Sequence, residues 1–167
     1  MEYSVRRAII EDTSSLAHII VESWRSAYSN LLPKDEIQRY LNVEIRKNQF
    51  EKYISQEEIV LIGYINDRPC GLVFASPEND EGVDRCGSIY SMYTIEEAWG
   101  KGLGKSLMDE VMIILKDEGC KRVLLWVYEE NPRARKFYEK CGFKFDGTSK
   151  ESHFSNNPIE LRYQREI

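Results

Sequence analysis

The chain has 167 residues and a formal net charge of −5, and 42% of its residues are apolar. This length suits one domain with a core of its own, so we expect residues 1–167 to form a single domain. The acidic balance argues against nucleic-acid binders and anionic-membrane binders, which carry a basic excess.

The first residues contain no apolar signal core, and no run of about 20 apolar residues occurs. We therefore expect a soluble, cytoplasmic protein. No two cysteines form a C-x-x-C motif, and the two histidines have no ligand-like neighbours. This predicts buried free thiols in a reducing compartment and no bound metal. The residues concerned are Cys70, Cys86, Cys120, Cys141, His18 and His153.

The N-terminal half begins with a short strand at 3–8 and a helix over 11–30, which Asp12 or Thr13 can cap. Further helical segments follow over 34–41 and 44–54, with a break near Asn42. Strands over 57–65 and 70–76 should form a hairpin, followed by a polar loop at 77–85 and a strand over 86–95. The apolar face of the first helix consists of Leu16, Ile19, Ile20, Trp24, Ala27 and Tyr28.

The C-terminal half alternates helices and strands. A helix is predicted over 102–117, then a continuous apolar strand over 122–128, which is typical of a strand covered on both faces. A short helix over 131–141 and two strands, 143–152 and 159–167, complete the chain. The order predicts an α/β (α+β) fold, a mixed sheet with helices on both faces. The expected buried stripe of the longer helix is Leu103, Leu107, Met108, Val111, Ile114 and Leu115.

Three glycines, Gly100, Gly102 and Gly104, alternate with other residues and lead directly into the helix that starts near 102. Backbone N–H groups without helical partners point outward at such a start and favour an anion. A phosphate-binding P-loop would need glycine at Trp99. The dinucleotide fingerprint G-x-G-x-x-G would need glycine at Lys105 or Leu107, so both motifs fail.

The segment from Trp99 to Gly104 resembles the Gln/Arg-x-x-Gly-x-Gly/Ala motif of the GNAT superfamily of acetyl-CoA-dependent N-acetyltransferases, with Trp99 in place of the usual Gln or Arg. The stretch 131–143 resembles the N-x-x-A-x-x-x-Y-x-x-x-G-F block of that family, and residues 23–37 resemble one bacterial branch. Within the stretch 131–143, the positions that match the family block are Asn131, Ala134, Tyr138, Gly142 and Phe143. The resemblance implies a mostly antiparallel sheet of about six or seven strands, with strands 4 and 5 splayed.

By this resemblance the chain transfers an acetyl group from acetyl-CoA to a primary amine, by direct attack in a ternary complex. The glycine loop would hold the pyrophosphate, and the end of the fourth strand would hold the pantetheine arm. The implied cofactor-binding residues are Met92, Tyr93, Thr94, Gly100, Lys101, Gly102, Leu103, Gly104, Lys105, Ser106, Asn131, Ala134 and Tyr138. Asn131 can also simply cap its helix.

Tyr138 is the expected catalytic residue. A phenol with a pKa near 10 can protonate a departing thiolate, whose thiol has a pKa near 8.5. In the branch that acetylates ribosomal proteins and N-termini, a glutamate base lies on the fifth strand. This chain has Trp126 at that position. Glu22, Glu97, Glu129 and Glu130 are the remaining candidate bases.

Trp24, Tyr28, Tyr90 and Trp126 are the candidate acceptor-binding residues. The acceptor itself stays open among a small cationic amine, an antibiotic, an amino acid and a peptide terminus. A homodimer is compatible with exposed strands near the C-terminus. The alternative function is a non-catalytic acyl-CoA-binding sensor or interaction module, because Trp99 departs from the motif and no base is evident.

Overall fold

The computed structural model describes all 167 residues. Its strands are β1 (Tyr3–Arg7), β2 (Ile59–Ile65), β3 (Arg68–Ser76), β4 (Cys86–Thr94), β5 (Arg122–Tyr128), β6 (Lys144–Glu151) and β7 (Ile159–Glu166). Its α-helices are α1 (Thr13–Tyr28), α2 (Lys34–Ile37), α3 (Val43–Ser55), α4 (Leu103–Asp117) and α5 (Pro132–Lys140). None of the helices has both the length and the apolar character needed to cross a membrane.

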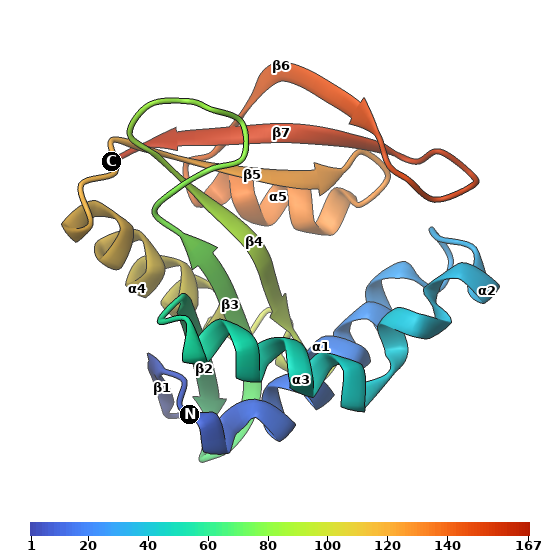
Figure 1. Cartoon of the computed structure of the whole chain (residues 1–167), viewed down its shortest axis with the longest axis vertical. Coiled ribbons are helices and arrows are strands. Elements are labelled where there is room, and N and C mark those ends of the chain that lie inside the picture. The colour runs from blue at the N-terminus through green and yellow to red at the C-terminus, as the bar shows by residue number, and fades with distance from the viewer.

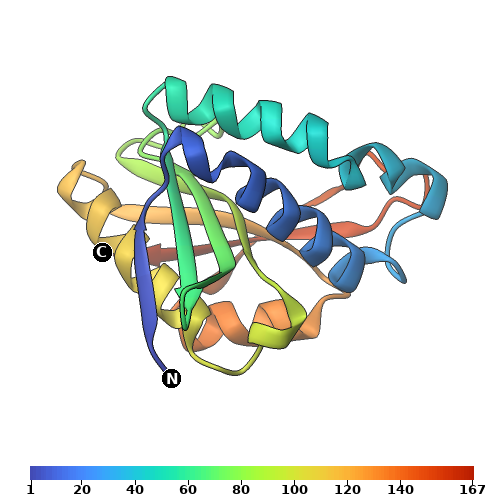
Figure 2. The same cartoon turned by 90° about the horizontal axis from the view of Figure 1, so that it is seen from below.

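All seven strands belong to one sheet, in the order β1-β2-β3-β4-β5-β7-β6. Neighbouring strands are antiparallel except β4 and β5, which are parallel. Helices α1 and α3 cover one face of the sheet, and α4 and α5 cover the other (Figures 1 and 2). The predicted mixed sheet with helices on both faces is therefore confirmed.

Local sequence signals account for most element boundaries. Asn66 and Asp67 adopt φ angles of 46° and 64°, which match the twist of the tight β2–β3 hairpin. Asn42, near which the sequence predicts a break between two helical segments, caps α3 by accepting a hydrogen bond at its side-chain oxygen. Gly119 and Gly142 follow α4 and α5 in left-handed conformation, with φ angles of 90° and 87°. All four cysteines are buried and free.

Helix α4 packs closely against β2 and β3. A Cβ atom at Gly63 would lie 2.9 Å from Leu103, and one at Gly71 would lie 2.7 Å from Leu107, so these glycines let the helix approach the sheet. The predicted stripe is correct except at Ile114, which is only partly buried, while Met112 is buried. This packing holds the N-terminus of α4, and the glycine loop before it, next to the sheet.

Strands β4 and β5 pair only from Cys86 to Ile89 on β4, with Ile89 opposite Leu125. Tyr90 is skipped in the pairing of β4 with β3, because Ser91 lies opposite Phe74 and Ile89 opposite Ala75. Such a bulge bends the strand that contains it. Beyond this point β4 turns away from β5, and the two strands diverge (Figure 1). The predicted splay of the fourth and fifth strands is confirmed.

The first helix does not start as predicted. Asp12 occupies the N-cap position of α1, but its carboxylate makes no capping bond to that helix. It accepts hydrogen bonds from both terminal nitrogens of Arg6, at 2.7 and 2.9 Å, and from the Ile9 N–H at 2.8 Å. The hydroxyl of Thr13 donates to the Ile10 carbonyl instead of capping. Neither residue is therefore a cap for α1, because local partners before the helix occupy both side chains.

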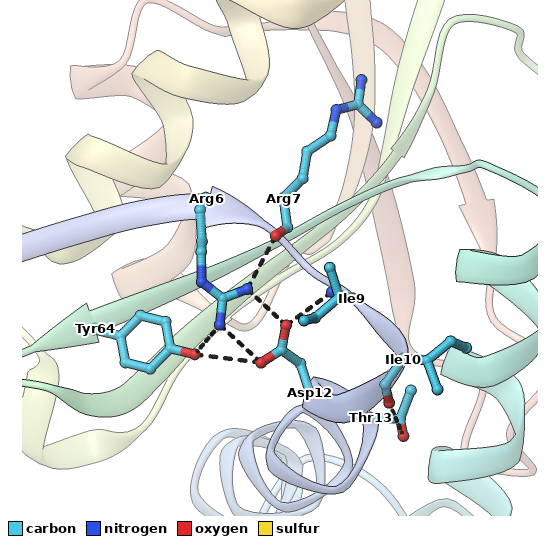
Figure 3. Close-up of polar contacts among 7 residues, drawn as sticks. All are labelled: Arg6, Arg7, Ile9, Ile10, Asp12, Thr13 and Tyr64. Atoms are coloured by element: carbon cyan, nitrogen blue, oxygen red, sulfur yellow. Dashed lines mark hydrogen bonds and ion pairs between the residues drawn. The ribbon is translucent and has the colours of Figure 1, made fainter.

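Arg6, Asp12 and Tyr64 tie β1, β2 and the start of α1 together (Figure 3). Arg6 also donates to the Tyr64 hydroxyl at 2.7 Å and to the Arg7 carbonyl at 3.1 Å. Asp12 is mostly buried, and the hydrogen bonds from Arg6 hold the pKa of its carboxyl below the ordinary value. The carboxylate form therefore stabilises the folded state.

Replacing Asp12 by asparagine should lower the free energy of unfolding by about 1–2 kcal/mol at pH 7, because the charge-assisted bonds from Arg6 are lost. The folded pKa lies below the unfolded value of about 3.9, so this contribution is present above that pH and disappears as the pH falls through the folded pKa. Urea unfolding at pH 7 and in acid measures the difference. Glu51→Gln, which removes an exposed pair with Lys47 at 3.9 Å, should stay within about 0.5 kcal/mol. Equal losses in both variants would contradict the assignment.

Candidate active site

The glycine loop presents unpaired backbone donors at the start of α4. Gly100 and Gly102 have φ angles of 72° and 92°, which turn the chain sharply before the helix. The loop and first-turn N–H groups that donate no hydrogen bond within the protein are those of Gly100, Gly102, Leu103, Gly104 and Lys105. Together with the partial positive charge of the helix N-terminus, they suit an anionic group such as a phosphate.

Gly104 allows α5 to pack against this anion-binding turn. A Cβ atom at Gly104 would lie 3.2 Å from the ring of Phe137, closer than most real contacts. Phe137 is half-buried and packs against the core. The contact places the side chains of α5 beside the loop.

Trp99 stands where the family motif has Gln or Arg. Its side chain supports the glycine loop instead of filling it. Its indole N–H donates to the Thr94 carbonyl at 3.0 Å, at the end of β4. The Arg133 guanidinium from α5 stacks on its ring, with Cζ 3.5 Å from the ring centroid. Burial lowers the pKa of Arg133, yet a guanidinium stays charged at neutral pH. Trp99 thus brings a cation to the edge of the loop.

A cleft of about 740 Å³ lies where β4 and β5 diverge. The cations that line it are Lys105, Arg133, Lys136 and Lys140 from α4 and α5 and Lys150 from β6, and aromatic side chains of α1, β4 and β5 also line it. Most of the residues singled out from the sequence meet here: Trp24, Tyr28, Tyr90, Met92, Tyr93, Thr94, Gly100, Gly102, Gly104, Lys105, Trp126, Asn131, Ala134 and Tyr138.

Three residues of the predicted cofactor-binding set do not line the cleft. The Lys101 carbonyl accepts a hydrogen bond from the Tyr3 hydroxyl. The side chain of Leu103 is fully buried in the core, and the Ser106 N–H donates to the Gly102 carbonyl at 3.2 Å. Leu103 can therefore contribute only its free backbone N–H. Contacts of Lys101 and Ser106 with the cofactor stay predictions.

Tyr138 projects from α5 into the cleft and is 9% exposed. Its hydroxyl has no hydrogen-bond partner in the protein, and burial raises its pKa well above the ordinary value. The phenol is therefore protonated at neutral pH and free to donate. Burial makes the phenol a weaker acid in isolation, and its neutral, unpartnered hydroxyl suits donation to a thiolate that forms beside it.

Asn131 caps α5 by accepting a hydrogen bond from the Ala134 N–H at 3.2 Å. Its side-chain amide also lines the cleft, so the capping role and a role toward a ligand are compatible. The cap fixes the first turn of α5 and thereby the direction in which Tyr138 points.

Further tyrosines gather on the other side of the cleft. The hydroxyls of Tyr28 and Tyr93 lie 3.2 Å apart, and the Tyr28 ring meets Tyr128 edge to face with centroids 5.4 Å apart. Burial raises the pKa of Tyr28 and Tyr93, and it raises that of Tyr128 to about 12. None of these phenols is ionised at neutral pH, so none of them is a ready proton acceptor.

None of the candidate bases Glu22, Glu97, Glu129 and Glu130 lines the cleft. The carboxylate that does is Glu160 on β7, which the sequence reasoning missed, together with Lys150, Ser152, His153 and Phe154 nearby. Their strands gave no sequence signal of nearness to the glycine loop. Only the insertion of β7 between β5 and β6 brings them to the cleft.

Comparison with known proteins identifies the family of this chain. The family described as Acetyltransferase (GNAT) family matches residues 16–143. The uncharacterized N-acetyltransferase YuaI of Bacillus subtilis is 30% identical over 133 residues, which cover 77% of this chain and 73% of that protein. The spermidine N(1)-acetyltransferase of Thermoplasma acidophilum is 25% identical over 153 residues, or 89% of this chain and 92% of that protein.

The PaiA N-acetyltransferase from Thermoplasma acidophilum, solved in complex with coenzyme A, shares the fold, with a TM-score of 0.83 over 100% of both chains at 22% identity. The family match spans most of the chain and includes both the glycine loop and the Asn131 block. The chain therefore belongs to the GNAT family of acetyltransferases and is an acetyl-CoA-dependent N-acetyltransferase.

Proposed function

We propose that this cleft transfers an acetyl group from acetyl-CoA to a primary amine of a cationic acceptor in a ternary complex: the reacting ammonium group loses a proton to water, and the neutral amine then attacks the thioester carbonyl directly. The observation that carries the proposal is the continuity of one cleft from the free N–H groups at α4 to the hydroxyl of Tyr138. Acetyl-CoA, when bound, supplies an activated acetyl thioester. The free N–H groups, with Lys105 and Arg133, bind its pyrophosphate charge.

The splayed edge of β4 holds the amide arm of the cofactor. Met92 and Tyr93 lie in the part of β4 that has left β5, so backbone groups there are available for strand-like pairing. The Thr94 carbonyl already accepts the hydrogen bond from the Trp99 indole. Only the N–H and the side chain of Thr94 can therefore contact the cofactor. Tyr138 donates its proton to the sulfur that leaves, since its phenol is neutral and unpartnered.

The acceptor end supports a cationic amine because it is aromatic. Trp24, Tyr28, Tyr90 and Trp126 line it, and two of these rings already accept a cation of the protein, Arg46 over Trp24 at 4.8 Å and Lys150 over Trp126 at 4.0 Å. The relative from Thermoplasma acidophilum that is named a spermidine N(1)-acetyltransferase supports a polyamine as the first acceptor to test.

We also propose that the protein acts as one domain in the cytoplasm and binds no nucleic acid. The unbroken seven-stranded sheet supports a single domain, and buried free cysteines suit a reducing compartment. Its net charge of −5 is unsuited to nucleic acid. A homodimer stays a prediction, for which the edge strand β6 is a candidate interface.

The function is tested first by calorimetric titration with acetyl-CoA, with ATP as control. The second test is an assay of the coenzyme A thiol that acetyl-CoA releases in the presence of spermidine, 1,4-diaminobutane or butylamine. We expect micromolar binding of acetyl-CoA, no binding of ATP, and thiol release that depends on the amine. Binding without turnover across a broad amine panel would instead favour the non-catalytic acyl-CoA-binding module.

Gly102→Ala should weaken acetyl-CoA binding by about tenfold or more, since a side chain at a φ of 92° shifts the loop by strain of about 1–2 kcal/mol. Gly119→Ala is the matched control. Gly119 has a φ of 90° at the other end of α4, where a Cβ would meet nothing within 4 Å. Both variants should lose similar stability in urea unfolding. An equal loss of acetyl-CoA affinity in both would contradict the role of the loop.

Tyr138→Phe should reduce kcat by about 10²–10⁴-fold with little change in KM for acetyl-CoA, because the proton donor is lost. The raised pKa of Tyr138 places any loss of wild-type activity through phenol ionisation above about pH 10. Tyr53→Phe, outside the cleft, is the control and should keep full activity. Steady-state kinetics between pH 6 and pH 10 measure the loss of kcat in Tyr138→Phe. Over the same range they check that the wild-type enzyme shows no loss through phenol ionisation. A fully active Tyr138→Phe variant would overturn the assignment.

A further inference from the structure

The charges around the cleft are unevenly distributed. Lys105, Arg133, Lys136 and Lys140 from α4 and α5 line it, with the Lys105 ammonium paired to Asp109, and Lys150 lines it from β6. Glu160 is the only carboxylate among the residues that line the cleft. A positively charged amine that enters this cleft is repelled by the cations that line it, and Glu160 is the one anion that can attract the amine.

Glu160 lies on the acceptor side of the sheet. On β7, Tyr163 faces α5, because its hydroxyl donates to Glu139 and accepts from Arg135 of that helix. Residues an odd number of positions away on a strand face the opposite side, so Glu160 points away from α5. It lies opposite Tyr128 of β5 in the strand register, and the Tyr128 ring in turn contacts Tyr28 of α1.

The carboxylate of Glu160 has no partner in the protein. It is partly buried, and no hydrogen bond or ion pair ends on it. Lys150 lies directly opposite on β6, but its ammonium rests over the Trp126 ring, 4.0 Å from the ring centroid. The carboxylate oxygens of Glu160 stay accessible from the cleft, so a ligand cation can reach them, and an ion pair there would offset the free-energy cost of partial removal from water.

Glu160 is faced by aromatic rings, by Ser152 and His153, and by the cation Lys150, whose ammonium rests over the Trp126 ring. Burial raises its pKa, and the charges of Lys150 and His153 oppose that rise only in part. Tyr128 hydrogen-bonds Ser152 at 3.3 Å, and Phe154 and Trp24 complete the wall. A carboxylate surrounded by aromatic rings is the combination that binds an ammonium group, through one ion pair and several ring faces.

We propose that Glu160 is the acceptor-binding carboxylate: it binds an ammonium group of the amine substrate and selects cationic amines over neutral or acidic ones. The inference rests on the proposed function and adds to it the residue that recognises the acceptor. The amine enters from the α1 side of the sheet, and the cofactor binds at the loop next to α5. The two ligands therefore meet where β4 and β5 diverge.

Glu160→Gln tests the inference because it keeps the shape and removes the charge. Glu151→Gln, on the exposed part of neighbouring β6 and outside the cleft, is the matched control. We expect Glu160→Gln to lower kcat/KM for spermidine by about 10- to 100-fold, mainly through KM, as for a lost bond to a charged group. KM for acetyl-CoA should change less than about twofold, and Glu160→Asp should restore part of the loss.

Calorimetry with spermidine, 1,4-diaminobutane and butylamine on the coenzyme A-loaded protein provides a readout independent of turnover. Glu160-dependent binding without acetylation would support this inference and refute the proposed function. Acetylation that is insensitive to Glu160→Gln would support the proposed function and refute this inference. Absence of binding by all three amines to the wild-type protein would overturn the inference.

The melting temperature separates recognition from a structural role. Because the carboxylate is unpaired, Glu160→Gln should melt at or above the wild-type temperature. A clear fall in melting temperature would show that Glu160 supports the fold, and would overturn the proposal.

Discussion

The parting of β4 from β5 is the constraint on which the rest of this molecule depends. The two strands are parallel neighbours up to Ile89 and Leu125, and then the skipped residue Tyr90 bends β4 away. Backbone groups that would pair within a continuous sheet are left open to a ligand. The Trp99 indole satisfies one of them, the Thr94 carbonyl, and fixes the start of the glycine loop at the same point.

The cleft that results has two ends of opposite character. At one end, free N–H groups of α4 and cations of α5 suit phosphates, and Gly104 lets the two helices come close enough to act together. At the other end, tyrosines kept neutral by burial surround a single carboxylate, Glu160. Tyr138 lies between them with an unpartnered hydroxyl. The two ends thus suit ligand groups of opposite charge, a phosphate and an ammonium group, on either side of the point where β4 and β5 diverge.

Much of this was accessible from local sequence. Hydrophobic periodicity placed the helices and strands, because the burial of one face follows the period of each element. The glycine loop predicted a turn with free N–H groups from short-range backbone geometry, and the resemblance of the Asn131 block to the GNAT family singled out Tyr138. Asp12 was misjudged as a cap because a sequence pattern does not show that Arg6 on β1 reaches its carboxylate first.

The sequence by itself therefore determined the elements, their order, the glycine loop before α4 and the family to which the chain belongs. Only the tertiary structure decided which strands lie side by side. The position of β7 between β5 and β6 brings Glu160, far from the glycine loop in the chain, to the opposite end of the same cleft. Strand pairing is set by packing between distant segments, and that information is not contained in the periodicity of any one of them.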